Sequence, residues 1–139
     1  MKVFLDANIL FSGSDANSRI SKLIKVIQKH GECVTSLYAI EEARRNIERK
    51  KYGSVEGLES ILENIFVDDR LLLSDIPVEL KSKDVPILGG AIAQQCTHLL
   101  TGDRKDFGFL YGERVANVLV VSTELLAEEM VAKGLIEEE

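Results

Sequence analysis

Cysteine is scarce in this sequence, and its two copies lie in different halves of the chain. Cys33 and Cys96 do not form the closely spaced pair that marks a metal site, and each lies beside a predicted strand. A chain of 139 residues buries a sizeable core without disulfides. We therefore expect both thiols to be reduced and partly buried, as in a cytoplasmic protein.

Long hydrophobic runs are also absent. The longest apolar stretches are far shorter than the roughly 20 residues of a membrane-spanning helix. No secretory signal is visible at the start, because the apolar stretch after Lys2 is interrupted by Asp6. We find no internal repeat or low-complexity linker, and the length predicts a single domain over residues 1–139. The sequence thus predicts a cytoplasmic protein that does not enter a membrane.

Positive charge is in the minority, with 17 lysines and arginines against 23 acidic residues and a net charge of −6. This balance argues against binding of nucleic acid through a general positive field, although it leaves room for local basic patches. An excess of acids is also expected where several carboxylates gather around cations that the count omits.

Two short apolar segments end close to acidic residues. Residues 3–5 have the β-branched and aromatic content of a buried strand, and Asp6 follows directly. Residues 97–101 form a similar segment, and Asp103 follows it. In open parallel sheets ligands bind outside the carboxyl ends of the strands, so neighbouring strands would bring both acids within reach of one cation. Taken alone, each acid is equally well explained as the start of a turn.

Strand-like runs and helical periodicity alternate along the chain, with a polar loop expected at residues 12–18. The predicted strands are residues 3–5, 32–35, 70–74, 97–101 and 118–121, and the predicted helices lie within 18–31, 36–49, 55–65, 84–95 and 123–134. This alternation predicts an α/β protein whose parallel sheet is covered on both faces. In the helix at 84–95, small residues from Gly89 to Ala93 leave one side nearly bare, which indicates close packing on the sheet.

Several acids are expected near the edge of the sheet where the strands end: Asp6, Asp84, Asp103, Asp106 and one of Glu41 and Glu42. Oxygen-rich clusters without histidine suit Mg²⁺ or Mn²⁺. Two carboxylates about 4 Å apart repel by roughly 4 kcal/mol at an effective dielectric constant of 20, so such a cluster favours a bound cation. A divalent ion there activates water and stabilises charge developing on a phosphodiester, as in nucleases and phosphatases.

Four segments together carry a resemblance to a known family. They are VFLDANIL at residues 3–10, Ser36 with Glu42 six residues on, DVPI at residues 84–87 with Ala91 and Ala93, and LTGDRKDF at residues 100–107. Their order and spacing, over nearly the whole chain, resemble the PIN domain family of VapC-like metal-dependent ribonucleases. The resemblance implies a three-layer α/β/α sandwich with a parallel five-stranded sheet in the order 3-2-1-4-5, and a Mg²⁺- or Mn²⁺-dependent endoribonuclease site. It also implies an RNA substrate and a homodimer, and it allows the role of a toxin paired with an antitoxin protein.

The resemblance assigns roles to individual residues. The catalytic acids would be Asp6, Glu42, Asp84 and Asp103, the metal-binding acids would be Asp6, Asp84, Asp103 and Asp106, and the supporting polar residues would be Asn8 and Thr101.

Two of these assignments compete with a local explanation. The apolar stripe of the helix at 36–49 places Glu41 on its flank and Glu42 nearly opposite, so periodicity favours Glu41 whereas the family spacing favours Glu42. Asp84 precedes Val85 and Pro86 and is equally suited to cap the helix that begins there.

Basic residues beside these acids are candidates for contact with RNA phosphates. Arg104 and Lys105 flank the predicted site, and Arg45 belongs to the dense basic run that extends from Arg44 to Lys51. Cations near the end of a helix are favoured by its dipole, so this run is also explained as an ordinary solvated face. His30 and His98 fit a helix end and a strand edge better than a ligand or a base.

Two alternatives to an active ribonuclease remain. The first is a protein with the same fold and weak or lost catalysis that binds RNA or a protein partner. The second is a phosphatase of the haloacid dehalogenase type with Asp6 as nucleophile, which is disfavoured because that chemistry needs an acid where this chain has Asn8.

Overall fold

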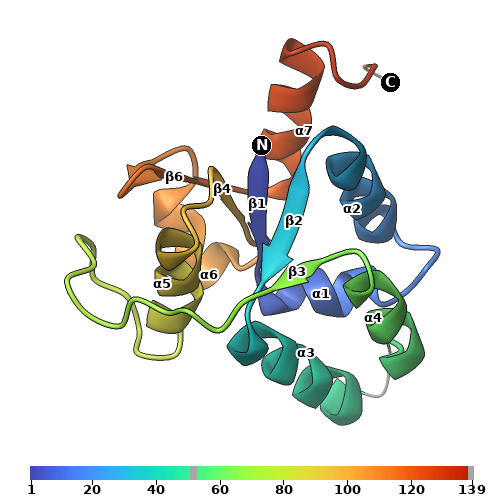
Figure 1. Cartoon of the computed structure of the whole chain (residues 1–139), viewed down its shortest axis with the longest axis horizontal. Helices are drawn as coiled ribbons and strands as arrows, with labels where there is room; N and C mark the ends of the chain where they lie inside the picture. Colours follow the sequence, from blue (N-terminus) through green and yellow to red (C-terminus); the bar gives the residue numbers. More distant parts are fainter. Residues whose placement is uncertain (51–52, 138–139) are drawn as a thin grey trace.

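A mixed sheet of six strands forms the centre of the computed structural model, which describes residues 1–50 and 53–137 (Figure 1). The strands are β1 (Lys2–Leu5), β2 (Glu32–Thr35), β3 (Phe66–Val67), β4 (His98–Leu100), β5 (Arg114–Val115) and β6 (Val118–Val121). Their order across the sheet is β3-β2-β1-β4-β6-β5. All neighbouring strands are parallel except β5, which runs antiparallel to β6.

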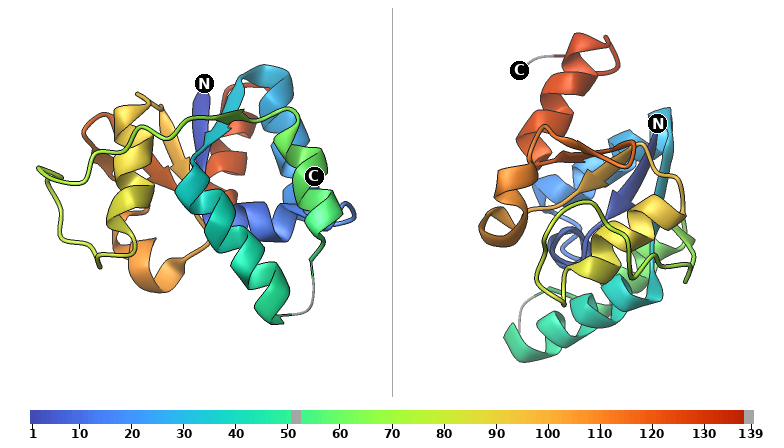
Figure 2. Two further views of the ribbon diagram at one scale, coloured as in Figure 1. Left: turned by 60° about the horizontal axis from the view of Figure 1, so that its bottom comes forward. Right: turned by 90° about the vertical axis from the view of Figure 1, so that its left-hand side faces the viewer.

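Helices lie on both faces of this sheet. They are α1 (Ala7–Gly13), α2 (Arg19–His30), α3 (Leu37–Lys50), α4 (Val55–Leu62), α5 (Val85–Ala93), α6 (Arg104–Phe107), the 3₁₀ turn η1 (Gly108–Leu110) and α7 (Thr123–Ala132). Helix α5 contacts β1 and β4, whereas α2 contacts β2 from the opposite face, as Figure 2 shows. The predicted α/β class is therefore confirmed.

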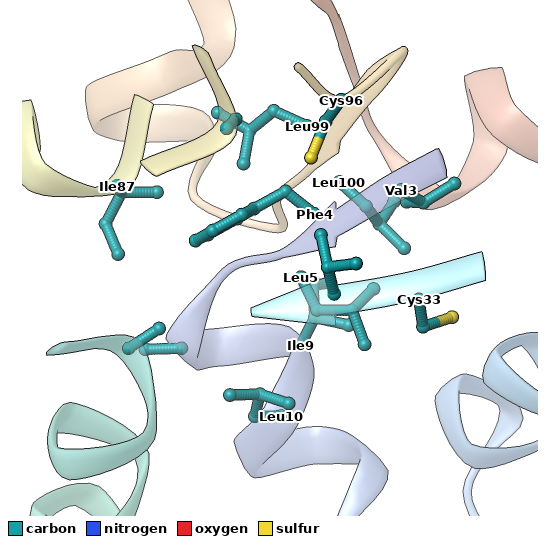
Figure 3. Packing of buried hydrophobic residues seen from close by; sticks show 14 of the residues in the cluster. Val3, Phe4, Leu5, Ile9, Leu10, Cys33, Ile87, Cys96, Leu99 and Leu100 are labelled. Carbon is teal, nitrogen blue, oxygen red and sulfur yellow. The ribbon is translucent and has the colours of Figure 1, made fainter. Parts of the chain in front are cut away.

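The core lies between the sheet and these helices. Alternate residues of β1 point to opposite faces, so Phe4 lies next to Ile87 of α5 while Leu5 lies next to Ile9 of α1 (Figure 3). All four side chains are at most 2% exposed. Burying each of them contributes about 1.5–3 kcal/mol, which holds the carboxyl end of β1 in a fixed position.

The prediction of five parallel strands is wrong, because the sheet has a sixth, antiparallel strand at its edge. Strands β5 and β6 form a hairpin in which Val115 pairs with Val118. Ala116 and Asn117 form its two-residue turn with φ angles of 48° and 70°. Such turns match the right-handed twist of the two strands, which explains the hairpin. The predicted order 3-2-1-4-5 holds for the other strands when β6 is counted as the fifth.

The prediction of a strand at residues 70–74 is also wrong. The third strand is Phe66–Val67, and the chain leaves the sheet after Asp68 donates its N–H to Thr35. Leu72 then crosses α5 and donates its N–H to the carbonyl of Gly89 at 3.1 Å. A Cβ at Gly89 would lie 1.8 Å from the Leu72 carbonyl oxygen, so the bare side of α5 accommodates this crossing segment.

Other boundaries differ from the prediction by a few residues. The stretch after β1 is helical through Gly13 as α1, so the predicted loop at 12–18 begins only at Ser14. Helix α4 ends at Leu62 and helix α5 at Ala93, earlier than expected. Both cysteines are buried and free, rather than half-buried. Across the described ranges we find no helix that is both long and apolar enough to cross a membrane.

His98 lies at the edge of its strand, as predicted, because it is the first residue of β4. His98 lies in the inner strand β4, and its side chain is 7% exposed. Its Nε2 is 2.9 Å from the Glu129 carboxylate of α7, and its Nδ1 is 2.7 Å from the hydroxyl of Thr97. These contacts tie the C-terminal helix to the sheet.

Candidate metal centre

The carboxyl ends of β1 and β4 lie side by side and position the first acid. Leu5 pairs with Leu100, so Asp6 and Thr101 become neighbours although they are far apart in the sequence. The Thr101 hydroxyl donates to Asp6 Oδ2 at 2.8 Å, and Asn8 donates to the same oxygen at 3.4 Å. The two predicted supporting residues therefore contact the acid at the end of β1.

Asp6 is a buried carboxyl group, 4% exposed, whose ionised form is disfavoured. Burial raises its pKa to about 7, and the negative charges of Glu42 and Asp84 add to this effect. The hydroxyl of Thr101 and the N–H of Ala7 act in the opposite direction by donating hydrogen bonds to the carboxylate. The surroundings thus hold an acid that titrates near neutral pH.

Three further acids gather beside it. Asp84 stands at the start of α5, and Asp103 and Asp106 follow β4, with the N–H of Asp106 donating to Asp103 Oδ1 at 3.0 Å. One carboxylate oxygen from each of the three lies within 4.8 Å of the others. Asp6 does not belong to this group of three, although its charge is coupled to that of Asp84.

Asp84 occupies the N-cap position of α5 but makes no capping hydrogen bond with its side chain. It is 6% exposed, and its Oδ2 has no hydrogen-bond partner among the described residues. Burial raises the pKa of Asp84 to about 6; Lys83 opposes the shift, while Asp106, Asp103 and Glu42 add to it. A buried carboxylate oxygen without a partner is costly, and a cation bound by the three acids would satisfy it. The residues present therefore fit a hard divalent metal such as Mg²⁺ or Mn²⁺.

Glu42 of α3 is half-buried and close enough to Asp6 and Asp84 for its negative charge to raise the pKa of both. Glu41 is exposed. The periodicity argument for Glu41 fails because α3 begins at the edge of the sheet. Its first turns therefore lie beside the acids and pack only partly on the core.

Two lysines that the sequence analysis missed complete the cluster. Lys81 Nζ lies 2.8 Å from Asp106 Oδ1, and Lys83 Nζ lies 2.9 Å from Asp106 Oδ2. These contacts lower the pKa of Asp106 to about 2, and the contact with Asp106 raises the pKa of Lys83. Tyr38 donates its hydroxyl to the carbonyl of Lys83 at 2.7 Å and thereby fixes this segment against α3. The signal available in the sequence was the position of Lys81 and Lys83 within the three residues before Asp84.

The three candidate RNA-binding residues are all exposed, but they lie on two different helices. Arg104 is close to the acidic centre but faces Glu124 of α7 at 3.7 Å, and Lys105 is exposed beside it. Arg45 is exposed on α3. Its positive charge acts to lower the pKa of Tyr38, whereas burial, which is the larger effect, raises that pKa. Lys51, the last residue of the predicted basic run, lies outside the described residues.

Comparison with known proteins supports the fold. No family model matches the chain, and no curated protein matches it. A chain of the crystal structure of VapBC2 from Rickettsia felis, bound to a DNA fragment from their promoter, is similar in structure with a TM-score of 0.58 and 16% sequence identity. The match covers 88% of this chain and 98% of that chain. At this identity the likeness shows a shared α/β fold and nothing further.

Proposed function

We propose that this protein is a PIN-like, Mg²⁺- or Mn²⁺-dependent endoribonuclease that hydrolyses RNA phosphodiesters. The observation that carries the proposal is the convergence of Asp84, Asp103 and Asp106 within 4.8 Å, with a buried Asp84 oxygen that has no partner among the described residues. Two such carboxylates repel by roughly 3–4 kcal/mol at an effective dielectric constant of 20, so the arrangement favours a cation.

The roles of the acids follow from their positions. Asp84, Asp103 and Asp106 would hold the ion, and when bound it would activate a water molecule and neutralise charge developing on the phosphodiester. Asp6 and Glu42 complete the acidic pocket. Asp6 is the candidate to accept a proton from the attacking water, because it is the buried acid held beside the group of three.

The lysines at the same edge would position the substrate. The Lys81 and Lys83 side chains are 56% and 55% exposed, and their charged ends lie beside Asp106. Lys81 and Lys83 would then hold RNA phosphates near the acids, while Asp84, Asp103 and Asp106 would hold the metal. Arg104 and Lys105 would add to this positive charge, and we call the four residues Lys81, Lys83, Arg104 and Lys105 the basic rim.

We further propose that the chain acts as a toxin of the VapC kind, held by an antitoxin protein, and that it works as a homodimer in the cytoplasm. The fold shared with a chain of the VapBC2 structure supports this proposal. Light scattering of the purified protein would give its oligomeric state. Induced expression in bacteria should arrest growth with the wild type and not with Asp103→Asn.

A second candidate function is RNA binding with weak catalysis. It is favoured by one observation: each oxygen of Asp106 already contacts a lysine, which weakens the attraction of this acid for a metal. In this case Lys81 and Lys83 would stabilise the metal-free protein, and RNA would bind to its basic rim without being cut.

Cleavage of a labelled single-stranded RNA in Mn²⁺ separates the two functions. The wild type should cut, Asp103→Asn and Asp6→Asn should cut at least a hundredfold more slowly, and chelation should stop the reaction. Glu32→Gln is the matched control, because Glu32 is exposed at the amino end of β2, away from the acids. Equal, negligible cleavage by the wild type and by Asp103→Asn would rule out the enzyme.

A further inference from the structure

A hollow of about 290 Å³ is lined by residues that neighbour Asp6 and Asp103 in the sequence. It lies between the end of β4 and the start of α7, and its lining includes Asn8, Gly102, Arg104, Tyr111, Ser122 and Glu124. Asn8 Oδ1 accepts the N–H of Gly102 at 2.8 Å, so these two lining residues, which lie close in sequence to Asp6 and Asp103, are fixed against each other. The volume approaches that of the smallest ligand pockets, about 300 Å³.

Tyr111 is an aromatic residue in the lining of this hollow, and a hydrogen bond fixes its side chain. Its hydroxyl donates to the carbonyl of Thr101 at 2.8 Å, and the ring is half-buried. The charges of Asp103 and Asp6 both raise the pKa of Tyr111, after the larger effect of burial, so the ring stands close to the acids. A tyrosine held in this way is a platform on which a nucleobase stacks without loss of side-chain freedom.

A charged pair stands on another side of the hollow. Arg104 Nη2 and Glu124 Oε1 are 3.7 Å apart, with side chains 76% and 63% exposed. This separation exceeds a hydrogen bond, so the two groups do not saturate each other, and guanidinium donors and carboxylate lone pairs stay available. The N–H of Glu124 itself and the hydroxyls of Ser122 and Thr123 lower the pKa of Glu124, which keeps its carboxylate ionised.

We propose that this hollow binds the guanine base of the nucleotide next to the cleaved phosphate; this inference rests on the proposed ribonuclease function. The Watson–Crick edge of guanine presents one acceptor, O6, and two donors, N1–H and the 2-amino group. Arg104 would donate to O6, Glu124 would accept from the two donors, and Tyr111 would stack on the ring. Adenine presents a ring nitrogen lone pair where guanine has N1–H, so it would face the carboxylate with an acceptor.

Binding tests the base preference without catalysis. The probes are labelled oligouridylates with a single guanosine, adenosine or inosine at the centre, measured by fluorescence anisotropy in chelator. We expect the wild type to bind the guanosine probe about tenfold more tightly than the adenosine probe, with inosine, which lacks the 2-amino group, in between. Glu124→Gln should reduce the ratio to below about threefold, because the amide offers a donor in place of an acceptor.

Glu128→Gln is the matched control. It removes the same charge from α7 one turn further on, where Glu128 is exposed and does not line the hollow. Its guanosine preference should equal that of the wild type. Equal affinity of the wild type for the guanosine and adenosine probes overturns the inference. The same conclusion follows from absence of binding to all three probes, or from equal loss of preference in both variants.

Cleavage of the same three probes in Mn²⁺ distinguishes failure of this inference from failure of the proposed function. Cutting that ignores the central base overturns the guanine pocket and retains the nuclease. A guanosine preference in binding without cutting by the wild type overturns the nuclease and retains the pocket as an RNA-binding site. Cutting next to guanosine, with the preference reduced in Glu124→Gln and kept in Glu128→Gln, supports both.

Discussion

At the scale of single residues, the acids of the site differ in how strongly the protein favours their ionised form. Asp6 and Asp84 both have a raised pKa, and burial is the largest cause for each. Asp106 has a lowered pKa because two lysines reach it. The site therefore combines acids that resist ionisation with one that is fully ionised. This combination makes the charge of the centre sensitive to pH and to bound cations.

The buried carboxyl of Asp6 should make the metal-free protein less stable as the pH rises. Its pKa is about 7 when folded and about 3.8 in an ordinary environment, so its favourable contribution is complete below about pH 4 and lost as the pH rises to about 7. The variant Asp6→Asn has no group that ionises at this position, so its stability does not fall for this reason as the pH rises. In chelator, the variant should melt at a temperature similar to the wild type at pH 4 and clearly higher at pH 8. A difference in melting temperature that does not change with pH would contradict the assignment.

Lys81 and Lys83 should compete with a metal ion for the charge of Asp106. Replacing both by alanine removes two positive charges within 3 Å of its oxygens. We expect the affinity for Mn²⁺, measured by isothermal titration calorimetry, to increase about tenfold. The control is the double variant Lys22→Ala and Lys25→Ala, which removes two exposed lysines of α2. If the two double variants bind Mn²⁺ equally well, the lysines have no effect on the site.

At the scale of elements, the crossing of residues 71–72 over α5 connects the site to the fold. Asp84 is the N-cap residue of α5. Further along the same helix, the backbone of Leu72 packs directly on Gly89. A side chain at Gly89 would displace the crossing segment, because its Cβ would come within 1.8 Å of the Leu72 carbonyl oxygen. The position of Asp84 therefore depends on a glycine that contributes no chemistry of its own.

Gly89→Ala should destabilise the protein by about 1–3 kcal/mol, the usual cost of overpacking. Gly108→Ala is the control, because the nearest atom to its added Cβ is 3.8 Å away. Its effect should stay within about 0.5 kcal/mol, as for most surface substitutions. Urea unfolding followed by circular dichroism measures both. Equal stability of the two variants would show that the crossing segment moves without cost.

At the scale of the whole molecule, the site joins parts of the chain that are distant in sequence. Asp84 precedes α5, whereas Asp103 and Asp106 follow β4, and α5 packs on β1 and β4 between them. A metal that binds the three acids binds only the folded protein, so it should stabilise the whole domain through mass action.

Mn²⁺ should raise the melting temperature of the intact domain. At 100 times the dissociation constant the gain is about 2.7 kcal/mol, which corresponds to roughly 5–10 °C for a chain of this size. Asp84→Asn should show little or no increase, whereas Glu32→Gln should respond like the wild type. Differential scanning calorimetry at several Mn²⁺ concentrations checks both expectations. An unchanged wild-type melting curve would count against the metal centre.

The sequence by itself determined the local features of this protein. Apolar runs that end on Asp6 and close to Asp103 predicted two strands with acids at their carboxyl ends, and the helical periodicity located α2 and α7. These features depend on neighbouring residues only, because strand and helix periodicity act over a few positions. They sufficed for the α/β class, whereas the expected order of the strands in the sheet rested on the resemblance to the PIN domain family.

The tertiary structure decided which residues meet. Residues 70–74 are rich in leucine, yet they cross α5 rather than joining the sheet, because Gly89 leaves room for their backbone. The same segment carries the chain to Lys81 and Lys83, which reach Asp106 through contacts that no local pattern encodes. The pairing of β1 with β4 brings Asp6 to Thr101 and opens the hollow beside Tyr111. Such contacts depend on packing across the whole chain, and burial there also sets the pKa values of the acids.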